Sequence, residues 1–326
     1  MASSKSTSTP PQTTDGQYDY PGPLITEPLS GTHLQSFILL HGRGSNALSF
    51  APVLLSTPIS QSDILPTAFP NAKFIFPTAS KRRVQRAKRI RSNQWFDIWQ
   101  VTAPDQREGL QNEGLRQTSK FVHGLIKKEV QQVGAANVIL IGLSQGCAAS
   151  LIAHMLWEGE PIAAVVGMCG WLPFEARFRE FFEDEKRKAT GNGDDIFEEI
   201  HVEDEPRDTT GPRSVELTAA QRILVFLDEE IEFSAARRPD RSFLEGTPIF
   251  LGHGAKDEKV PIELGRGASE VLRSLKLDVE FHEYPGLGHW YSTEMLGDIV
   301  KFIKDHCQGW GTVNTALKGR RCCHIM

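Results

Sequence analysis

The sequence predicts an α/β fold, in which a mainly parallel sheet is flanked by helices. The first observation behind this prediction is a series of short apolar runs rich in β-branched residues, which is typical of buried strands. The second is that stretches with apolar residues at helical spacing separate several of these runs, and such alternation indicates a parallel sheet. The predicted strands are residues 36–40, 73–77, 138–141, 161–168, 248–251 and 277–284. The main predicted helices are residues 108–133, 262–275 and 292–306.

The composition is that of a globular protein. Of the 326 residues, 40% are hydrophobic and 24% are charged, and both fractions are ordinary. The formal net charge of −5 gives no general attraction to nucleic acid, so no nucleic-acid partner is expected. The five cysteines include no C-x-x-C pair, so neither a disulfide framework nor a metal site is predicted. A reducing, cytoplasmic compartment is expected, and no apolar run is long enough to span a membrane.

One domain is predicted over residues 34–310, between two flexible ends. Residues 1–33 are rich in Ser, Thr, Pro and Gly and lack the apolar core of a signal peptide. We therefore expect a disordered lead-in that ends in an extended segment. Residues 311–326 are expected to form a flexible tail. The oligomeric state cannot be predicted from these features.

An insertion is predicted at residues 172–246, after the strand at 161–168. Its stretch 178–208 is dense in Asp and Glu and offers little that can be buried, so part of the insertion is expected to be disordered. Residues 217–238 have the spacing of an amphipathic helix. An insertion at this point can overhang the carboxyl ends of the strands as a lid, or it can be a decoration without function.

A candidate nucleophile lies at the end of the strand at 138–141. The chain continues there as Gly142-Leu143-Ser144-Gln145-Gly146, and small or apolar residues at helical spacing follow. A G-x-S-x-G at a strand-to-helix turn is the nucleophile elbow of α/β hydrolases, in which the two glycines permit a sharp turn and the Ser hydroxyl stands above the sheet. The sequence therefore predicts Ser144 as a nucleophile. The alternative is a plain glycine-rich loop.

The strand at 36–40 leads into a second glycine-rich loop, which has two functional interpretations. The first is a dinucleotide-binding fingerprint, because Gly42, Gly44 and Ala47 match G-x-G-x-x-A and Asp63 follows at about the right distance. That interpretation requires a second strand ending at the acid. The intervening residues contain two prolines and end in a polar stretch, which disfavours such a strand.

The second interpretation is an oxyanion-hole loop. Such a loop supplies one backbone N–H to the developing oxyanion, and the residue after the nucleophile supplies the other. Here the two donors are the amides of Arg43 and Gln145, and the flanking Gly42 and Gly44 let the main chain turn toward the substrate. A tight turn without a ligand is the alternative.

A strongly basic run covers residues 81–91, and aromatic residues follow at 95–99. The interpretation we favour is a solvated loop beside an aromatic cluster that belongs to the core or to a pocket wall. A basic patch beside aromatic residues is also compatible with binding of single-stranded nucleic acid, which the net charge disfavours. A docking surface for anionic head groups or acidic protein is the third alternative.

An acid and a histidine occupy the places where the chain order Ser, Asp, His of such hydrolases requires them. Asp257 comes shortly after the strand at 248–251, and Glu258 is the alternative acid. His289 comes in the loop after the strand at 277–284, at the edge of the sheet where ligands bind. The other histidines after Asp257 lie within a strand, at the end of a helix and in the tail: His282, His306 and His324.

The chain resembles the phospholipase/carboxylesterase family, which includes acyl-protein thioesterases. It contains, in this order, HGRGSNA, QWFDIW, GLSQG, HGAKDEKVP and PGLGHW, and the similarity covers about residues 37–173 and 248–307. The resemblance implies an α/β-hydrolase fold, Ser144 as nucleophile, Asp257 and His289 as the rest of the triad, and neither a metal nor an organic cofactor. Members act on thioesters of palmitoylated proteins, on lysophospholipids or on small esters.

The expected function is therefore that of a serine hydrolase, most closely an acyl-protein thioesterase or carboxylesterase acting on an acylated protein, a lipid or a small ester. A lysophospholipase and a general short-chain carboxylesterase are the alternatives, and a non-catalytic hydrolase-like binding protein is the alternative of another class. Two departures affect the expected substrate. Arg43 stands where the family often has Leu, and the insertion at 172–246 is larger than a compact thioesterase needs.

The C-terminal residues form a candidate lipidation motif. The last four, Cys323-His324-Ile325-Met326, match C-a-a-X apart from the polar His324, and a terminal Met favours farnesylation. Cys322 is a candidate for palmitoylation, and three basic residues precede it. Because a single lipid binds membranes only marginally, peripheral membrane association requires these signals to act together. A plain disordered tail is the alternative.

Overall fold

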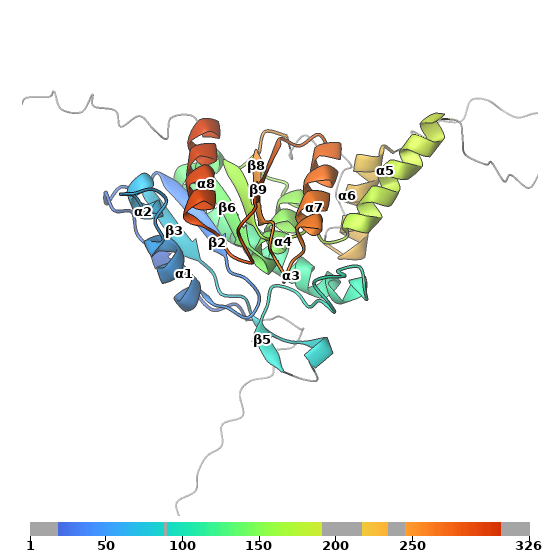
Figure 1. Ribbon diagram of the computed structural model, residues 1–326, viewed down its shortest axis with the longest axis horizontal. Helices are drawn as coiled ribbons and strands as arrows, with labels where there is room; N and C mark the ends of the chain where they lie inside the picture. Colours follow the sequence, from blue (N-terminus) through green and yellow to red (C-terminus); the bar gives the residue numbers. More distant parts are fainter. Residues whose placement is uncertain (1–18, 88–89, 191–216, 234–244, 308–326) are drawn as a thin grey trace, which may run out of the picture.

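A seven-stranded sheet forms the centre of the computed structural model, which describes residues 19–87, 90–190, 217–233 and 245–307 (Figure 1). The strand order is β1-β3-β2-β6-β7-β8-β9. The strands are β1 (Leu24–Thr26), β2 (Gln35–Leu40), β3 (Ala72–Phe76), β6 (Val138–Leu143), β7 (Ala164–Met168), β8 (Ile249–Gly254) and β9 (Val279–Tyr284). All neighbours in the sheet pair in parallel except β1, which is antiparallel to β3. The predicted α/β fold with a mainly parallel sheet is confirmed.

Helices cover both faces of this sheet. The helices are α1 (Ala47–Ser56), α2 (Leu65–Ala68), α3 (Asn112–Val133), α4 (Gln145–Met155), α5 (Glu175–Thr190), α6 (Ala219–Glu230), α7 (Ile262–Ser274) and α8 (Thr293–His306). Buried side chains of α1, α2 and α8 form one hydrophobic core with the sheet, and those of α3, α4, α5, α6 and α7 form the other. The sheet is therefore a layer between two cores, which agrees with the rule that parallel sheets are covered on both faces.

Alternate residues of each central strand belong to different cores. On β2, Phe37 and Leu39 face α1 and α8, whereas Ile38 and Leu40 face α3 and α4. Both faces need apolar residues, and this explains why the strands read as continuous apolar runs rather than as alternating patterns. The parallel register pairs Leu40 of β2 with Gly142 of β6, so the loops that follow these two strands begin side by side.

The N-terminal segment contributes to the sheet. Within the lead-in predicted for residues 1–33, β1 pairs with β3, and the ring of Tyr20 stacks on Phe121 of α3 with the ring centroids 4.0 Å apart. The structure describes the chain from residue 19 onward, so the prediction of disorder for residues 1–18 lies outside the described residues.

The basic run forms a hairpin rather than the predicted solvated loop. Strands β4 (Lys81–Arg83) and β5 (Arg91–Asn93) pair antiparallel, and a 3₁₀ turn (Gln85–Ala87) lies between them. Lys81 and Arg83 point to solvent, but Arg82 is only 4% exposed and donates to Tyr20 Oη at 3.1 Å. The alternation of a strand therefore buries one cation between two exposed ones. The predicted burial of the aromatic residues that follow is confirmed for Trp95 and Phe96.

The predicted insertion contains two helices where one was expected. Phe178 of α5 is fully buried, which contradicts the prediction that residues 178–208 offer little to bury. The reason is that aromatic residues at helical spacing face α6: Phe178 of α5, and Phe174 just before this helix, contact Phe226 edge to face. Helix α6 lies within the predicted 217–238 and begins at a capping box. Residues 191–216 and 234–244 lie outside the described residues.

Strand β8 is longer than predicted. The turn was expected to begin at Gly252, but Gly252, His253 and Gly254 continue the parallel pairing with β9. The reason is that β9 offers partners as far as Tyr284, and backbone pairing does not depend on the apolar pattern that ends at residue 251. The extension brings the loop with Asp257 to the edge of the sheet.

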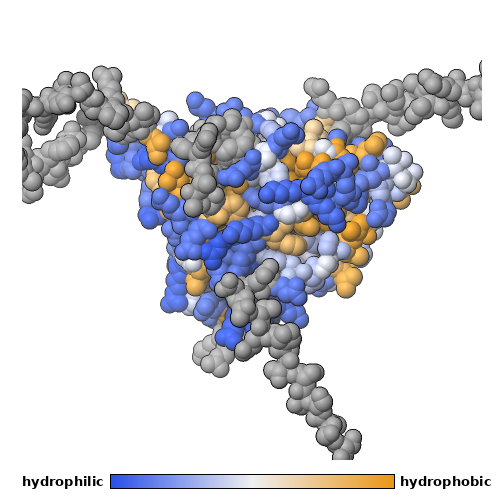
Figure 2. Space-filling model, turned by 180° about the vertical axis from the view of Figure 1, so that it is seen from behind, coloured by the Kyte–Doolittle hydropathy of each residue, from blue (hydrophilic) through white to orange (hydrophobic). Residues whose placement is uncertain are grey.

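Hydrophilic and apolar residues alternate on the face of the molecule shown in Figure 2. Hydrophilic residues cover much of this face. Among the described residues, the most exposed large apolar side chains are Leu48 and Ile90, at 75% and 65%. None of the helices in the described ranges combines the length and the apolar character needed to cross a bilayer.

Candidate active site

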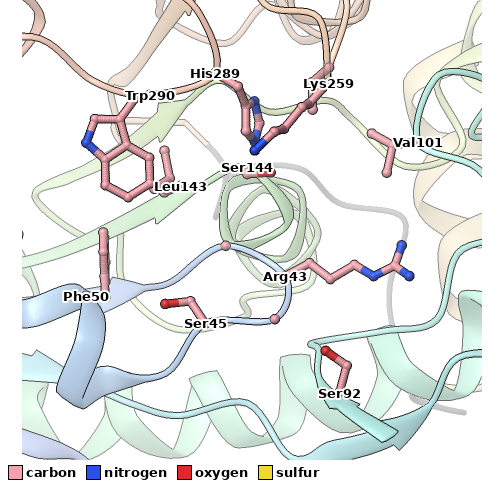
Figure 3. A pocket seen from close by; sticks show the side chains of 13 residues that line it. Arg43, Ser45, Phe50, Ser92, Val101, Leu143, Ser144, Lys259, His289 and Trp290 are labelled. Carbon is pink, nitrogen blue, oxygen red and sulfur yellow. The ribbon is translucent and has the colours of Figure 1, made fainter. Parts of the chain in front are cut away.

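Ser144 lies at the sharp turn between β6 and α4. Its backbone has φ 56° and ψ −118°, a conformation that costs free energy for a residue other than glycine. The Ser144 N–H donates to the carbonyl of Met168 at the end of β7, at 2.8 Å. The turn thus rests against the neighbouring strand, and the side chain of Ser144 faces the pocket shown in Figure 3.

The two glycines of the elbow are required because backbone atoms approach them closely. A Cβ at Gly142 would lie 2.2 Å from the carbonyl oxygen of Gly146, and a Cβ at Gly146 would lie 2.3 Å from the carbonyl oxygen of Leu40. Neither glycine has a positive φ. The two glycines therefore allow β6, α4 and the end of β2 to pack closely, whereas the strained backbone dihedral angles are those of Ser144 itself.

Asp257 and His289 form the second part of the site. His289 Nδ1 donates to Asp257 Oδ2 at 2.7 Å, because a carboxylate oxygen can only accept. The other ring nitrogen, Nε2, is then free of a proton and can accept one. His289 lines the same pocket as Ser144 and points toward it in Figure 3. No hydrogen bond joins the two side chains among the described residues, and such bonds often tighten only when substrate binds.

The carboxylate of Asp257 is held in place on both oxygens. Oδ1 accepts from the backbone N–H groups of Lys259 and Val260, each at 2.9 Å. His253 Nε2 lies 3.4 Å from Oδ2 and also donates to the Val260 carbonyl at 2.9 Å. Burial by itself raises the pKa of Asp257, but the hydrogen bonds from His253, His289 and Val260 outweigh it and hold the pKa well below the usual range. Asp257 is therefore ionised at neutral pH.

The loop after β2 lies against the nucleophile. A Cβ at Gly42 would lie 3.5 Å from Ser144 Cβ, which is an ordinary contact, whereas Gly44 has φ +83° and so needs to be glycine. The Gly44 N–H donates to the Asn93 carbonyl at 2.8 Å. The N–H of Arg43 donates no hydrogen bond within the described part of the chain, and neither does the N–H of Gln145, the first residue of α4. Both amides predicted for an oxyanion hole therefore lie beside Ser144 and are unused.

Buried His41 fixes the course of this loop. Its Nδ1 donates to the Gly42 carbonyl at 2.7 Å, and its Nε2 accepts from the N–H of Ala79 at 3.0 Å. Burial lowers the pKa of His41 to about 4, so the ring is neutral at pH 7. A helix after such a loop is also found in dinucleotide-binding folds, but Asp63 lies between α1 and α2, and the next strand, β3, begins only at Ala72, so no strand ends at the acid as that fold requires.

The side chain of Gln145 has a role that the motif alone does not reveal. Its Oε1 accepts from the N–H of Trp95 at 3.1 Å, and its Nε2 donates to the Phe96 carbonyl at 2.8 Å. The Trp95 indole in turn donates to the His41 carbonyl at 2.7 Å. These bonds join the elbow, the loop after β2 and the aromatic segment into one unit. In the sequence, the signal for such a unit is that HGRGSNA, QWFDIW and GLSQG belong to the same set of family motifs.

The pocket at Ser144 has a volume of about 380 Å³. Glycines of the loop after β2, five apolar residues, two cations, His289 and three serines share its wall. The lining residues are Gly42, Arg43, Gly44, Ser45, Phe50, Ser92, Val101, Leu143, Ser144, Lys259, Val260, His289 and Trp290. No described residue of the predicted insertion 172–246 lines this pocket, so the described helices α5 and α6 do not act as a lid over it.

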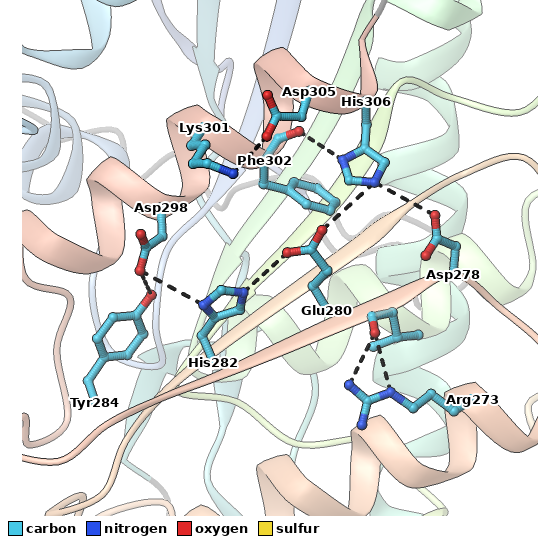
Figure 4. Close-up of polar contacts among 11 residues, drawn as sticks. Arg273, Asp278, Glu280, His282, Tyr284, Asp298, Lys301, Phe302, Asp305 and His306 are labelled. Atoms are coloured by element: carbon cyan, nitrogen blue, oxygen red, sulfur yellow. Dashed lines mark hydrogen bonds and ion pairs between the residues drawn. The ribbon is translucent and has the colours of Figure 1, made fainter.

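The alternative acid and the other described histidines after Asp257 lie elsewhere. Glu258 is exposed and lies outside the pocket lining. His282 lies between Glu280 and Asp298, at 3.2 and 3.9 Å, where β9 meets α8 (Figure 4). His306 does not line the pocket either. Its Nδ1 donates to the carbonyl of Phe302 in the preceding turn of α8. The geometry thus selects Asp257 and His289 from these candidates.

The remaining predictions concern metal binding and the cysteines. Within the described residues, no cluster of three or more His, Cys, Asp or Glu has the arrangement of a metal site. The candidate lipidation residues, Cys322 and Cys323, lie in the tail beyond residue 307, outside the described residues. The three described cysteines are free thiols, and all are buried.

A nucleophile elbow, a parallel sheet of this order, and a His–Asp pair on the loops after the last two strands define the α/β-hydrolase class of serine hydrolases. The particular family follows from comparison with known proteins. A model of the phospholipase/carboxylesterase family matches residues 24–190 and 233–307. The chain therefore belongs to the phospholipase/carboxylesterase family. Helix α5 lies inside the matched range, and α6 lies outside it.

Individual relatives are similar over most of their length. Acyl-protein thioesterase 1 of Gibberella zeae is 24% identical over 286 residues, which are 86% of this chain and 94% of the relative. Carboxylesterase SOBER1 of Arabidopsis thaliana is 24% identical over 281 residues, 84% of this chain and 92% of the relative. The crystal structure of Zea mays acyl-protein thioesterase 2 has a TM-score of 0.57 and 21% identity, and the match covers 87% of this chain and 98% of that one. At this identity the structural likeness speaks for the fold alone.

Proposed function

We propose that the protein is a serine hydrolase that cleaves acyl thioesters and esters, with S-acylated protein as its substrate. One observation carries the proposal: the hydrogen bond of 2.7 Å between Asp257 and His289, which directs the free nitrogen of the imidazole into the pocket that holds Ser144. A protein that only binds an ester does not need this arrangement, whereas an activated serine does.

In the first half-reaction Ser144 attacks the acyl carbonyl. His289 Nε2 takes the hydroxyl proton as Oγ forms its bond to the carbonyl carbon, and the ionised Asp257 stabilises the imidazolium. The amides of Arg43 and Gln145 donate to the oxyanion, and loss of one such donor typically costs about a hundredfold or more in rate. The bond from carbon to sulfur or oxygen then breaks, and His289 returns the proton to the leaving group.

In the second half-reaction water releases the acid. His289 takes a proton from water as the hydroxide oxygen bonds to the acyl carbon, and the same two amides stabilise the second oxyanion. The acyl carbon then separates from Ser144 Oγ, which regains a proton from His289. The free enzyme is restored without any co-reactant other than water.

One feature supports a thioester, and a second supports a long aliphatic acyl chain. The relatives named above include proteins called acyl-protein thioesterases. The pocket wall on one side of Ser144 consists of Phe50, Leu143 and Trp290, which offer apolar surface to an aliphatic chain. A lysophospholipase and a short-chain carboxylesterase use the same chemistry and are the competing outcomes of the test.

The test compares purified wild type with Ser144→Ala on matched octanoyl and palmitoyl thioesters and oxygen esters. We expect the wild type to hydrolyse the palmitoyl thioester with the highest kcat/KM, and Ser144→Ala to lose at least about 10⁴-fold in kcat because the nucleophile is missing. Circular dichroism of the variant controls for folding. Faster turnover of short oxygen esters identifies a general carboxylesterase instead.

A serine-reactive fluorophosphonate separates catalysis from binding. We expect the wild type to be labelled at Ser144, and Ser144→Ala to stay unlabelled. A wild-type protein that neither turns over any of the four substrates nor reacts with the probe contradicts the proposed function and favours the hydrolase-like binding protein.

We further propose that Cys323 is farnesylated and that Cys322 and the basic residues of the tail add to membrane affinity. This attachment would bring a cytoplasmic enzyme to S-acylated proteins at the membrane surface. The additional signals are needed because a single lipid gives only marginal membrane binding. Intact mass after expression in a prenylating host decides the matter. A mass that includes unmodified Cys323 with Ile325 and Met326 still present rules the modification out.

A further inference from the structure

Two cations line the pocket at Ser144, and no Asp or Glu is among the lining residues. They are Arg43, on the loop after β2, and Lys259, two residues after Asp257. Within the described residues, neither side chain has an ion pair or a hydrogen bond to a protein group. Two like charges facing one small cavity repel each other and give it a positive potential, which an anionic ligand relieves.

Two carboxylates close to the pocket, Asp257 and Asp97, already have other partners. Asp257 is occupied by His289 and by two backbone N–H groups. Asp97 accepts from the N–H groups of Gln85 and Ile98, both at 3.0 Å. Desolvation lowers the pKa of Arg43, and Asp97 offsets this only in part, because Arg86 of the hairpin acts in the opposite direction. The pocket therefore keeps its excess of positive charge.

The three large apolar side chains and the Arg43 guanidinium occupy different sides of Ser144, although the smaller Val101 lies on the side of the guanidinium. In Figure 3, Phe50, Leu143 and Trp290 lie on one side of the serine. The guanidinium of Arg43 lies on the other, and Lys259 reaches toward Ser144 from the loop that also borders His289. An aliphatic acyl chain gains free energy on the apolar side and would leave the cations without a partner on their own side. The leaving group of the ester then faces the cations.

We propose that the substrate carries a negative charge, as carboxylate or phosphate, on its leaving group, and that Arg43 and Lys259 bind this charge. The inference rests on the proposed function, since a leaving group exists only for an acyl-transfer reaction. It names a property of the substrate that acyl hydrolysis alone does not require. Acidic residues next to an acylated cysteine, or a phosphate on the alcohol of a lipid ester, would supply such a charge.

The test uses thioesters that differ only in charge. The S-octanoyl thioester of 3-mercaptopropionate is compared with that of 3-mercaptopropionamide, which has the same size and no charge. We expect kcat/KM to be higher for the carboxylate by about fivefold or more, as for one or two partly exposed ion pairs. The ratio should fall toward one between about 0.02 M and about 0.5 M NaCl, since salt screens such pairs. An octanoyl thioester of 2-mercaptoethyl phosphate shows whether phosphate serves better than carboxylate.

Variants assign the preference to the two cations. Arg43→Gln and Lys259→Gln should each lower the ratio of kcat/KM between the charged and the neutral thioester toward one. Lys256→Gln is the matched control, because Lys256 is an exposed cation of the same loop as Lys259 but does not line the pocket. It should keep the wild-type ratio. If a variant fails to fold, the salt dependence of the wild-type ratio still decides.

The outcomes separate this inference from the proposed function. Equal or slower hydrolysis of the charged thioester, with Ser144-dependent turnover of both, overturns the inference and leaves the proposed function standing. The same holds if the anion is preferred on the acyl side, measured with the octanedioic monothioester of 3-mercaptopropionamide. If the wild type hydrolyses none of these thioesters, the proposed function fails and the inference fails with it.

Discussion

The elbow at Ser144 and the helix pair α5–α6 are held in place by different kinds of contact. At the elbow, backbone meets backbone, and a single methyl group at Gly142 or Gly146 would overlap main-chain atoms at 2.2–2.3 Å. In the helix pair, side chains meet side chains: the ring of Phe226 lies 5.6 Å from Phe174 and 6.1 Å from Phe178. The first arrangement fixes atoms for chemistry, and the second supplies buried apolar area.

The difference indicates how the two regions contribute. In the proposed mechanism, residues around the elbow carry out the reaction, so we expect their replacement to change kcat. Residues of α6, which lies outside the part matched by the family, contribute to the free energy of unfolding without touching the pocket. Each of the following substitutions tests one side of this comparison.

The largest effect is expected from Asp257→Asn. An amide in place of the carboxylate favours the wrong tautomer of His289, and kcat should fall by about 10⁴-fold while the fold stays intact. Steady-state hydrolysis of the octanoyl thioester measures it. Glu258→Gln, a change at the exposed neighbour, is the control and should be as active as wild type. Equal losses in the two variants would mean that Asp257 has been wrongly chosen.

Leu227→Ala tests the helix pair. Leu227 belongs to α6 and is fully buried, so its truncation should lower the free energy of unfolding by about 2–5 kcal/mol. Because α6 does not line the pocket, kcat/KM at 25 °C should not change. Urea unfolding and thioester hydrolysis are measured on the same sample, with Leu29→Ala, at a position that is 62% exposed, as the matched control. A fall in kcat/KM in the folded variant would show that α6 does couple to the site.

Lowering the pH should reduce the free energy of unfolding, because two buried histidines near the elbow are neutral in the folded protein. Burial lowers the pKa of both His41 and His154 of α4 to about 4, so between about pH 6.5 and pH 4 the unfolded chain binds more protons than the folded one. Stability is therefore lost as the pH falls through this range, by roughly 2 kcal/mol per histidine between pH 7 and pH 5.

His154→Met isolates one of these two contributions. The variant replaces a buried ring by an apolar side chain that does not titrate, so the difference in unfolding free energy between pH 7 and pH 5 should shrink by roughly 2 kcal/mol. Urea unfolding at the two pH values measures it. An unchanged difference would mean that His154 is not held neutral.

The smallest effect is expected from His253→Phe. His253 lies behind Asp257 and positions its carboxylate without reaching the pocket, so we expect a loss of about tenfold in kcat with little change in KM. His282→Phe, at the contact of β9 with α8, serves as the control and should retain wild-type activity. A rise in KM at constant kcat would assign His253 to substrate binding instead.

Much of the sheet and the choice of Ser144, Asp257 and His289 could be predicted because each depends on residues close together in the sequence. Buried parallel strands read as apolar runs, and the loops after them carry the motifs at the same edge of the sheet. The resemblance of five motifs to one family pointed to the same residues.

Other features depend on which distant segments come into contact. Helix α5 was missed because only a few aromatic residues interrupt its charged sequence, and their value depends on Phe226 of α6. Arg82 belongs to a run that reads as solvated, yet Tyr20, 62 positions earlier, gives its guanidinium a partner. Lys259 lies at the pocket because of the turn that brings its N–H to Asp257, and no local sequence pattern predicts this position.

The two hydrogen bonds of the Gln145 side chain have a consequence for the order of folding. They join segments 50 and 49 positions apart, and the bond from His289 to Asp257 closes a further loop of 32. Loops of this length close late compared with helix formation, because their closure costs chain entropy that only the contacts of the assembled sheet offset. During refolding, helical circular dichroism should recover first and thioester hydrolysis last. A newly made chain would thus carry no reactive serine until its tertiary structure is complete.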